Sequence, residues 1–142
     1  MSKVIVIYWS GSGNTAKMAE AVAGGAKEKG AEVICKNVSE ASVDELAGYD
    51  AVAFGSPAMG AEVIEEGEME PFFSSALPKL SGRKVALFGS YDWGDGEWLR
   101  TWTDRVKGGG AVMVAEGVKA HLEPDDDALA ACAALGAKLA GA

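Results

Sequence analysis

The sequence has few of the residues on which covalent and metal-based frameworks depend. It contains only two cysteines, Cys35 in an apolar run and Cys132 in an alanine-rich stretch, and one histidine, His121. This number and spacing excludes a disulfide framework and a cysteine-based zinc site. No Ser/His/Asp or Cys/His set for nucleophilic catalysis is apparent. We expect both cysteines to be small core residues and His121 to be a surface residue.

Positive charge and long apolar runs are also scarce. Thirteen Lys and Arg face 21 Asp and Glu, which gives a formal net charge of −8. Nucleic-acid binding depends on clustered Lys and Arg, so we expect no nucleic-acid partner and favour partner proteins with basic docking patches. No apolar run approaches the roughly 20 residues of a membrane span, and the N-terminal residues show no small-residue cleavage site. We therefore expect a cytoplasmic protein without a membrane partner.

Apolar runs rich in Val, Ile and Phe alternate with helical patterns along the chain. The runs predict strands at 3–9, 31–38, 50–56, 83–91 and 111–118. Helices are expected from the loop after the first strand to Gly30, and at 69–80, 96–110 and 124–142, with a weak one at 43–48. This alternation predicts right-handed crossovers, a parallel sheet and one doubly wound α/β domain spanning 1–142. Such sheets bind ligands beyond the carboxyl ends of their strands, so the loops after strands one, three and four are the candidates.

The loop after the first strand, "SGSGNT" (10–15), has the composition of a phosphate-binding loop. The lysine of a nucleoside-triphosphate loop is absent, and Lys17 is expected to be a solvated helix residue. Gly11, Gly13 and Ala16 fit the relaxed dinucleotide pattern, but the acid it needs near the end of the second strand is missing, since Glu32 lies at that strand's start.

Four side-chain donors beside a helix N-terminus instead suit a phosphate monoester with three free oxygens. These donors are Ser10, Ser12, Asn14 and Thr15. The alternative is that they only cap the helix.

The loops after strands three and four offer two side chains that suit a flat ligand. Trp93 lies in the polar segment "YDWGDGE", with nothing apolar beside it, and Met59 lies at a loop tip. Met packs well on aromatic rings, so the two could hold a planar ring between them, as flavin mononucleotide (FMN) would require. The alternative is that Trp93 folds back onto Tyr91 or Trp98. Trp98 and Trp102 are expected to be packing residues, although Trp98 is near enough in sequence to border the ligand.

The segments "YWSGSGNT", "GSPAMGAEVIEEGEMEPFF" and "VALFGSYDWGDGEW" resemble signature segments of the short-chain flavodoxins, in particular those of anaerobic bacteria such as clostridia. The resemblance implies a flavodoxin-like three-layer sandwich, with a five-stranded parallel sheet of order 2-1-3-4-5 and helices on both faces. It implies FMN as cofactor, with the phosphate on the four donors above, the isoalloxazine between Met59 and Trp93, and Glu62 at the ring N3–H. The pyrimidine end of the isoalloxazine would contact main-chain groups of Ser90, Tyr91 and Asp92. The remaining candidate contacts are Gly11, Gly13, Ser56, Pro57, Ala58, Gly60, Ala61 and Trp98.

Two residues depart from that resemblance. Asp92 stands where close relatives more often have glycine, which adds a negative charge, and Ala61 replaces a polar residue common after the loop glycine. Gly60 could allow a peptide to turn its carbonyl toward flavin N5 and stabilise the semiquinone. Acids clustered in both loops should lower the semiquinone/hydroquinone potential.

The function expected from these features is that of a low-potential one-electron carrier, a monomer that shuttles between semiquinone and hydroquinone to serve redox partner proteins. The alternative is an FMN-dependent quinone-type reductase on the same fold. A phosphoacceptor domain is set aside because Trp9-Ser10 and Gly55-Ser56 stand where it would need acids.

Overall fold

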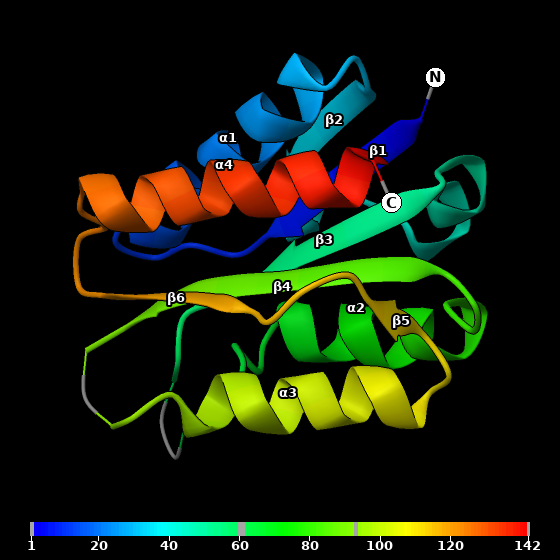
Figure 1. Ribbon diagram of the computed structural model, residues 1–142. Helices are drawn as coiled ribbons and strands as arrows, with labels where there is room; N and C mark the ends of the chain where they lie inside the picture. The colour runs from blue at the N-terminus through cyan, green and yellow to red at the C-terminus, as the bar shows by residue number, and fades with distance from the viewer. Residues whose placement is uncertain (1, 60–61, 93, 142) are drawn as a thin grey trace.

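A parallel β-sheet runs through the centre of the structure, a computed structural model that describes residues 2–59, 62–92 and 94–141 (Figure 1). The sheet path is built from β1 (Lys3–Tyr8), β2 (Glu32–Asn37), β3 (Ala51–Gly55), β4 (Lys84–Tyr91) and β5 (Val112–Met113). These strands lie in the order β2-β1-β3-β4-β5, and neighbouring strands pair in parallel. The order 2-1-3-4-5 that the resemblance implied is therefore confirmed.

The fifth strand differs from the expected single run at 111–118. It consists of β5 and a second piece, β6 (Val118–His121), and both pair with β4. Met113 pairs with Val85, and Val118 pairs with Phe88. The chain therefore advances five residues from β5 to β6 while β4 advances only three. The intervening segment contains Gly117, where an added Cβ would lie only 3.0 Å from the Leu99 side chain. A glycine at such a close approach interrupts the ladder and bends the strand.

The α-helices of the described residues cover both faces of the sheet (Figure 1). α1 (Asn14–Glu28) and α4 (Asp126–Gly141) lie on one face, and α2 (Met69–Ala76) and α3 (Glu97–Gly108) lie on the other. Short 3₁₀ segments occur at Val38–Glu40, Val43–Gly48 and Leu77–Lys79. The weak helix expected at 43–48 is thus a 3₁₀ helix, begun by a capping box between Ser42 and Glu45.

The strands alternate their side chains between two cores. The core under α2 and α3 includes Ile5, Ile7, Val52, Phe54, Phe73, Val85, Leu87, Trp98 and Trp102. The core under α1 and α4 includes Val4, Val6, Met18, Val22, Ala26, Phe88, Cys132 and Leu135. Because both faces of the inner strands are buried, the strands appear in the sequence as continuous apolar runs.

Helices α1 and α4 pack closely because two glycines leave room for backbone. A Cβ built on Gly25 would lie 1.9 Å from the Ala133 carbonyl oxygen, and one on Gly136 would lie 1.9 Å from that of Val22. Both glycines lie within helices, so they are required here for space rather than for an unusual φ. Just beyond the C-terminal end of α1, Gly30 has a φ of 88° and is the expected left-handed residue that follows the helix.

The expectation for Cys35 is wrong. Cys132 is fully buried, as expected, and this burial raises the pKa of its thiol to about 12, but Cys35 is exposed. The cause is the position of β2, which is the outer strand of the sheet and is exposed or half-buried along its length. An apolar run in sequence does not distinguish an edge strand from a central one.

Within the described ranges, no helix is both long and apolar enough to cross a membrane.

Candidate functional site

Three loops meet at the carboxyl end of the sheet: loop one (10–15), loop three (56–62) and loop four (90–95). The main chain joins the latter two, since Ala58 N–H donates to the Ser90 carbonyl at 3.0 Å. The hydroxyls of Thr15 and Ser90 lie 3.1 Å apart and are buried, so loop one is tied to loop four. The candidate residues, spread over most of the sequence, are therefore brought to one place by the strand order.

Loop one is held by its own hydroxyl groups. Ser10 Oγ accepts a hydrogen bond from Gly13 N–H at 3.0 Å, and Ser12 Oγ accepts one from Asn14 N–H at 3.4 Å. A hydroxyl that accepts from the backbone keeps its own hydrogen for a ligand. Gly13, which precedes α1, has a φ of 96°, and α1 has neither a side-chain cap nor an acid in its first turn. The start of α1 is therefore arranged to favour an anion.

Loop three forms a narrow hairpin around its tip. Met59 and Val63 exchange two backbone hydrogen bonds, of 2.8 and 3.1 Å. Gly60 and Ala61, expected at the tip, lie outside the described residues. Glu62 follows with a φ of 55°, a left-handed conformation that is uncommon for a residue other than glycine.

The Glu62 carboxylate is the strongest sign of a missing partner. Its Oε1 is buried and has no hydrogen-bond partner within the described part of the chain. The carboxylate lies against loop four, since a Cβ built on Gly94 would come within 2.4 Å of its Cδ. A buried carboxylate oxygen without a donor is costly, so a ligand that offers an N–H here would be favoured. The other such atom, Trp102 Nε1, lies among the rings of Phe54 and Phe73 in the core.

Glu65 anchors loop three to the rest of the fold, a role that the sequence analysis missed. Its carboxylate, only 8% exposed as a residue, accepts from the N–H groups of Gly67, Glu68 and Met69 at 2.7 to 2.8 Å. Its own N–H donates to Ser56 Oγ at 2.9 Å. Glutamate is an unusual residue for this position, so the usual Ser/Thr/Asp/Asn capping pattern gave no signal.

Loop four places Ser90, Tyr91 and Asp92 beside loop three, while Trp93 lies outside the described residues. Trp98 is 1% exposed and donates its indole N–H to the Ser56 carbonyl at 3.1 Å. The expectation that Trp98 and Trp102 are packing residues is therefore confirmed. Trp98 also supports Ser56 from beneath, and its ring lies 5.6 Å from that of Tyr91.

Part of the acidic charge around these loops is neutralised by arginine. Glu70 and Arg105 form a pair of hydrogen bonds of 2.7 Å each, which hold the pKa of Glu70 below its ordinary value. The hydrogen bond from Arg100 lowers the pKa of Asp95 in the same way. Lys17 is exposed and pairs with Glu123 at 3.1 Å, in agreement with its expected solvated role.

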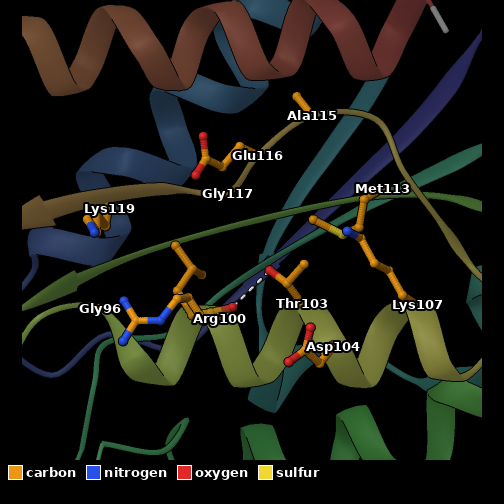
Figure 2. Close-up of a pocket in the computed structure, with 11 residues that line it drawn as sticks. Gly96, Arg100, Thr103, Asp104, Lys107, Met113, Ala115, Glu116, Gly117 and Lys119 are labelled. Atoms are coloured by element: carbon orange, nitrogen blue, oxygen red, sulfur yellow. Dashed lines mark hydrogen bonds between the residues drawn. The ribbon is translucent and has the colours of Figure 1, made fainter.

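A hollow away from the three loops lies between α3 and the segment that joins β5 to β6 (Figure 2). Its lining mixes the cations Arg100, Lys107 and Lys119 with the anions Asp104 and Glu116. Neither of the two unpartnered buried atoms lines it, which makes the three loops the better candidate site. The described residues contain no group of three or more His, Cys, Asp or Glu that could hold a metal.

The residues of the three loops fit FMN. Loop one offers hydroxyls and an uncapped helix start to the phosphate, and Glu62 offers an unpartnered oxygen to a ring N–H. Bound there, FMN would supply reversible electron transfer, while the chain's own groups would position and desolvate it.

Comparison with known proteins shows the family of the chain. The family model described as Flavodoxin matches residues 6–136. The flavodoxin of Clostridium beijerinckii is 48% identical over 95% of this chain and 97% of its own. That of Megasphaera elsdenii is 43% identical over 81% of this chain and 84% of its own. The solution structure of two-electron reduced Megasphaera elsdenii flavodoxin superposes with a TM-score of 0.87 at 41% identity, covering 98% of this chain and 99% of that one.

The match over nearly the whole chain and the shared fold together show that this protein belongs to the flavodoxin family of FMN-dependent electron-transfer proteins.

Proposed function

We propose that this chain is a low-potential one-electron carrier that holds FMN non-covalently and shuttles between its semiquinone and hydroquinone forms. The observation that carries the proposal is the buried Oε1 of Glu62, which faces Gly94 and has no hydrogen-bond partner among the residues that the structure describes. Buried polar atoms of native proteins are nearly always hydrogen-bonded, so a carboxylate oxygen without a donor favours a ligand that brings one.

In this proposal the phosphate lies at the start of α1. Ser10 and Ser12 are already oriented by the Gly13 and Asn14 N–H groups, so their hydroxyl hydrogens remain free to donate. Asn14 and Thr15 complete the donor set, and Gly11 and Gly13 let the backbone come close. With Lys17 paired to Glu123, no lysine of α1's first turn balances the phosphate charge.

The ring would lie between loops three and four. Met59 and Trp93 would contact its two faces, and Glu62 would accept from N3–H. Backbone groups of Ser90, Tyr91 and Asp92 would contact the pyrimidine end of the isoalloxazine. The remaining contacts to the ring would come from loop three: Ser56, Pro57, Ala58, Gly60 and Ala61. Trp98 supports the start of loop three from beneath, because its indole N–H donates to the Ser56 carbonyl.

Uncompensated acids near the ring would keep the potential low. Glu66 is exposed in the segment after loop three and Asp92 is exposed on loop four, and the whole chain carries a formal net charge of −8. Negative charge near a developing anion disfavours the second reduction step. The same charges would steer basic partner proteins toward the flavin edge, and a monomer would present that edge to each partner in turn.

An anaerobic dithionite titration of the FMN-loaded protein near neutral pH, followed by absorbance, tests the function. A blue neutral semiquinone that forms before the flavin bleaches is the expected result. Direct bleaching without that intermediate would favour the quinone-type reductase instead. Failure of the purified protein to take up FMN at all would overturn the site.

A further inference from the structure

The end of β6 holds the beginning of loop four by two consecutive hydrogen bonds. His121 stands opposite Tyr91 in the sheet register. A ring nitrogen of His121, Nε2, lies 2.8 Å from the Asp92 carbonyl oxygen, and Leu122 N–H donates to the Tyr91 carbonyl at 2.7 Å. Two successive carbonyls of loop four are therefore bound by two successive residues of the other strand.

The acceptor determines where the His121 proton lies. A carbonyl oxygen can only accept, so Nε2 must carry the hydrogen of this bond. The bond is available to the neutral ring in one tautomer and to the imidazolium, in which it becomes charge-assisted. The ring also packs against Tyr91, with centroids 5.1 Å apart.

The backbone after His121 is held in an unfavourable conformation. Leu122 has a φ of 61°, which a leucine seldom adopts, and as a residue it is 46% exposed. Little apolar burial compensates for this strain. Such a conformation persists only where the surrounding structure imposes it, and here it accompanies the bonds to Tyr91 and Asp92.

We propose that His121 is a positioning residue for the flavin-contacting part of loop four, acting through its Nε2–H bond to the Asp92 carbonyl. The inference rests on the proposed function, because the residue that follows Asp92 is Trp93, the proposed contact on one face of the ring. A fixed Asp92 carbonyl orders the main chain at the point where loop four reaches the ligand. Loop ordering before binding lowers the cost of binding.

Three variants of the full chain separate the hydrogen bond from the ring contact. His121→Phe keeps a ring against Tyr91 and removes the donor, His121→Gln keeps a donor and removes the ring, and His121→Ala removes both. Flavin-free protein is titrated with FMN and with riboflavin, followed by flavin fluorescence. We expect His121→Phe and His121→Ala to weaken the binding of FMN and of riboflavin equally, by roughly three- to tenfold, the usual range for one hydrogen bond. His121→Gln should stay within about twofold of the parent protein.

A phosphate-loop variant serves as the positive control. Ser12→Ala should weaken FMN binding and leave riboflavin binding unchanged, because riboflavin has no phosphate. Equal affinity of the Phe variant and the parent, or an equal loss in the Gln and Phe variants, would overturn the role of His121 and leave the proposed function standing. A parent protein that binds neither flavin would overturn both.

A measurement on the parent protein covers the case in which a variant fails to fold. His121 is the chain's one histidine, so its ring nitrogens give a single set of signals in ¹⁵N NMR. We expect the neutral ring of the FMN-bound protein to be in the Nε2–H form, with a proton that exchanges slowly. An Nδ1–H form would contradict the bond to Asp92.

Discussion

The indole N–H of Trp9 donates to Glu68 Oε1 at 3.2 Å, so the residue before loop one is joined to the segment that follows loop three. The Trp9 ring also covers Gly11, where an added Cβ would lie 3.1 Å from it. The Trp9 side chain therefore connects the proposed phosphate site in loop one to the proposed ring site in loop three, which follow different strands. The effect of this connection on FMN affinity can be measured.

Trp9→Phe should lower FMN affinity by about two- to threefold. It removes an exposed hydrogen bond of small net value, together with the Cη2 and Cζ3 atoms that lie over Gly11. Isothermal titration with FMN measures this change. Glu68→Gln is the matched control, since it keeps an acceptor oxygen, and its affinity should stay within about twofold of the parent. A tenfold loss in the control would show that the charge of Glu68, and not the link, is what matters.

Gly94→Ala should weaken FMN binding through Glu62. The new Cβ would lie 2.4 Å from Glu62 Cδ, so the carboxylate must move, and Gly94 has a φ of 91°. Gly82→Ala is the control: its φ is 77°, but a Cβ there meets nothing within 4 Å. Both variants should lose roughly 1–2 kcal/mol of unfolding free energy from backbone strain, measured by urea denaturation. Only Gly94→Ala should also lose FMN affinity; an equal loss in Gly82→Ala would contradict the contact.

Removing the negative charges of Glu66, just after loop three, and Asp92, on loop four, should raise the semiquinone/hydroquinone potential. At about 10 Å in water one charge contributes about 0.4 kcal/mol, or on the order of 20 mV per electron, so Glu66→Gln with Asp92→Asn should give roughly twice that at low salt. Spectroelectrochemistry measures the shift. Glu28→Gln, at the far end of α1, removes a single negative charge roughly 20 Å away and should have little effect. Equal shifts in both proteins would contradict local electrostatics as the cause.

The ion pair of Glu70 with Arg105 should contribute stability that depends on pH. Hydrogen bonds from Arg105 lower the pKa of Glu70 from its ordinary 4.5. A lowered pKa stabilises the folded state above pH 4.5, and that contribution disappears as the pH falls through the folded-state value. The parent should therefore exceed Glu70→Gln in unfolding free energy at pH 7, by less than about 1 kcal/mol for a partly exposed pair.

Urea denaturation of the Glu70 variant at several pH values measures this difference. The exposed Glu66→Gln serves as the control. A difference between the parent and Glu70→Gln that persists unchanged well below pH 4 would rule out the ion pair as its source.

Gly60→Ala should reduce the semiquinone yield, because a Cβ restricts the peptide rotation proposed to turn a carbonyl toward flavin N5. Gly60 lies outside the described residues, so this prediction rests on the sequence alone. The maximum semiquinone fraction during anaerobic reduction is the measurement. The control is Gly48→Ala, in the 3₁₀ segment that precedes the amino end of β3, the opposite end of that strand from loop three. An unchanged yield in Gly60→Ala would remove the flip from the proposal.

Several features were predictable because they depend on neighbours in sequence. The apolar runs gave the central strands, and the glycine and hydroxyl pattern of 10–15 identified loop one. The break between β5 and β6 was not predictable, since it arises where Gly117 meets Leu99 of α3. The exposure of Cys35 was not predictable either, because only the strand order shows that β2 is at the edge.

The sequence by itself determined the periodicity of the strands and helices, the turn glycines and the acidic charge, because these depend on residue type and local spacing. Only the tertiary structure decided which carboxylates are paired and which is left without a partner. Glu65, Glu70 and Glu62 lie within a span of nine residues. Glu65 caps a helix, Glu70 binds Arg105, and Glu62 has a buried oxygen to which no described residue donates. Their roles differ because their partners come from distant parts of the chain, brought to one end of the sheet by its strand order.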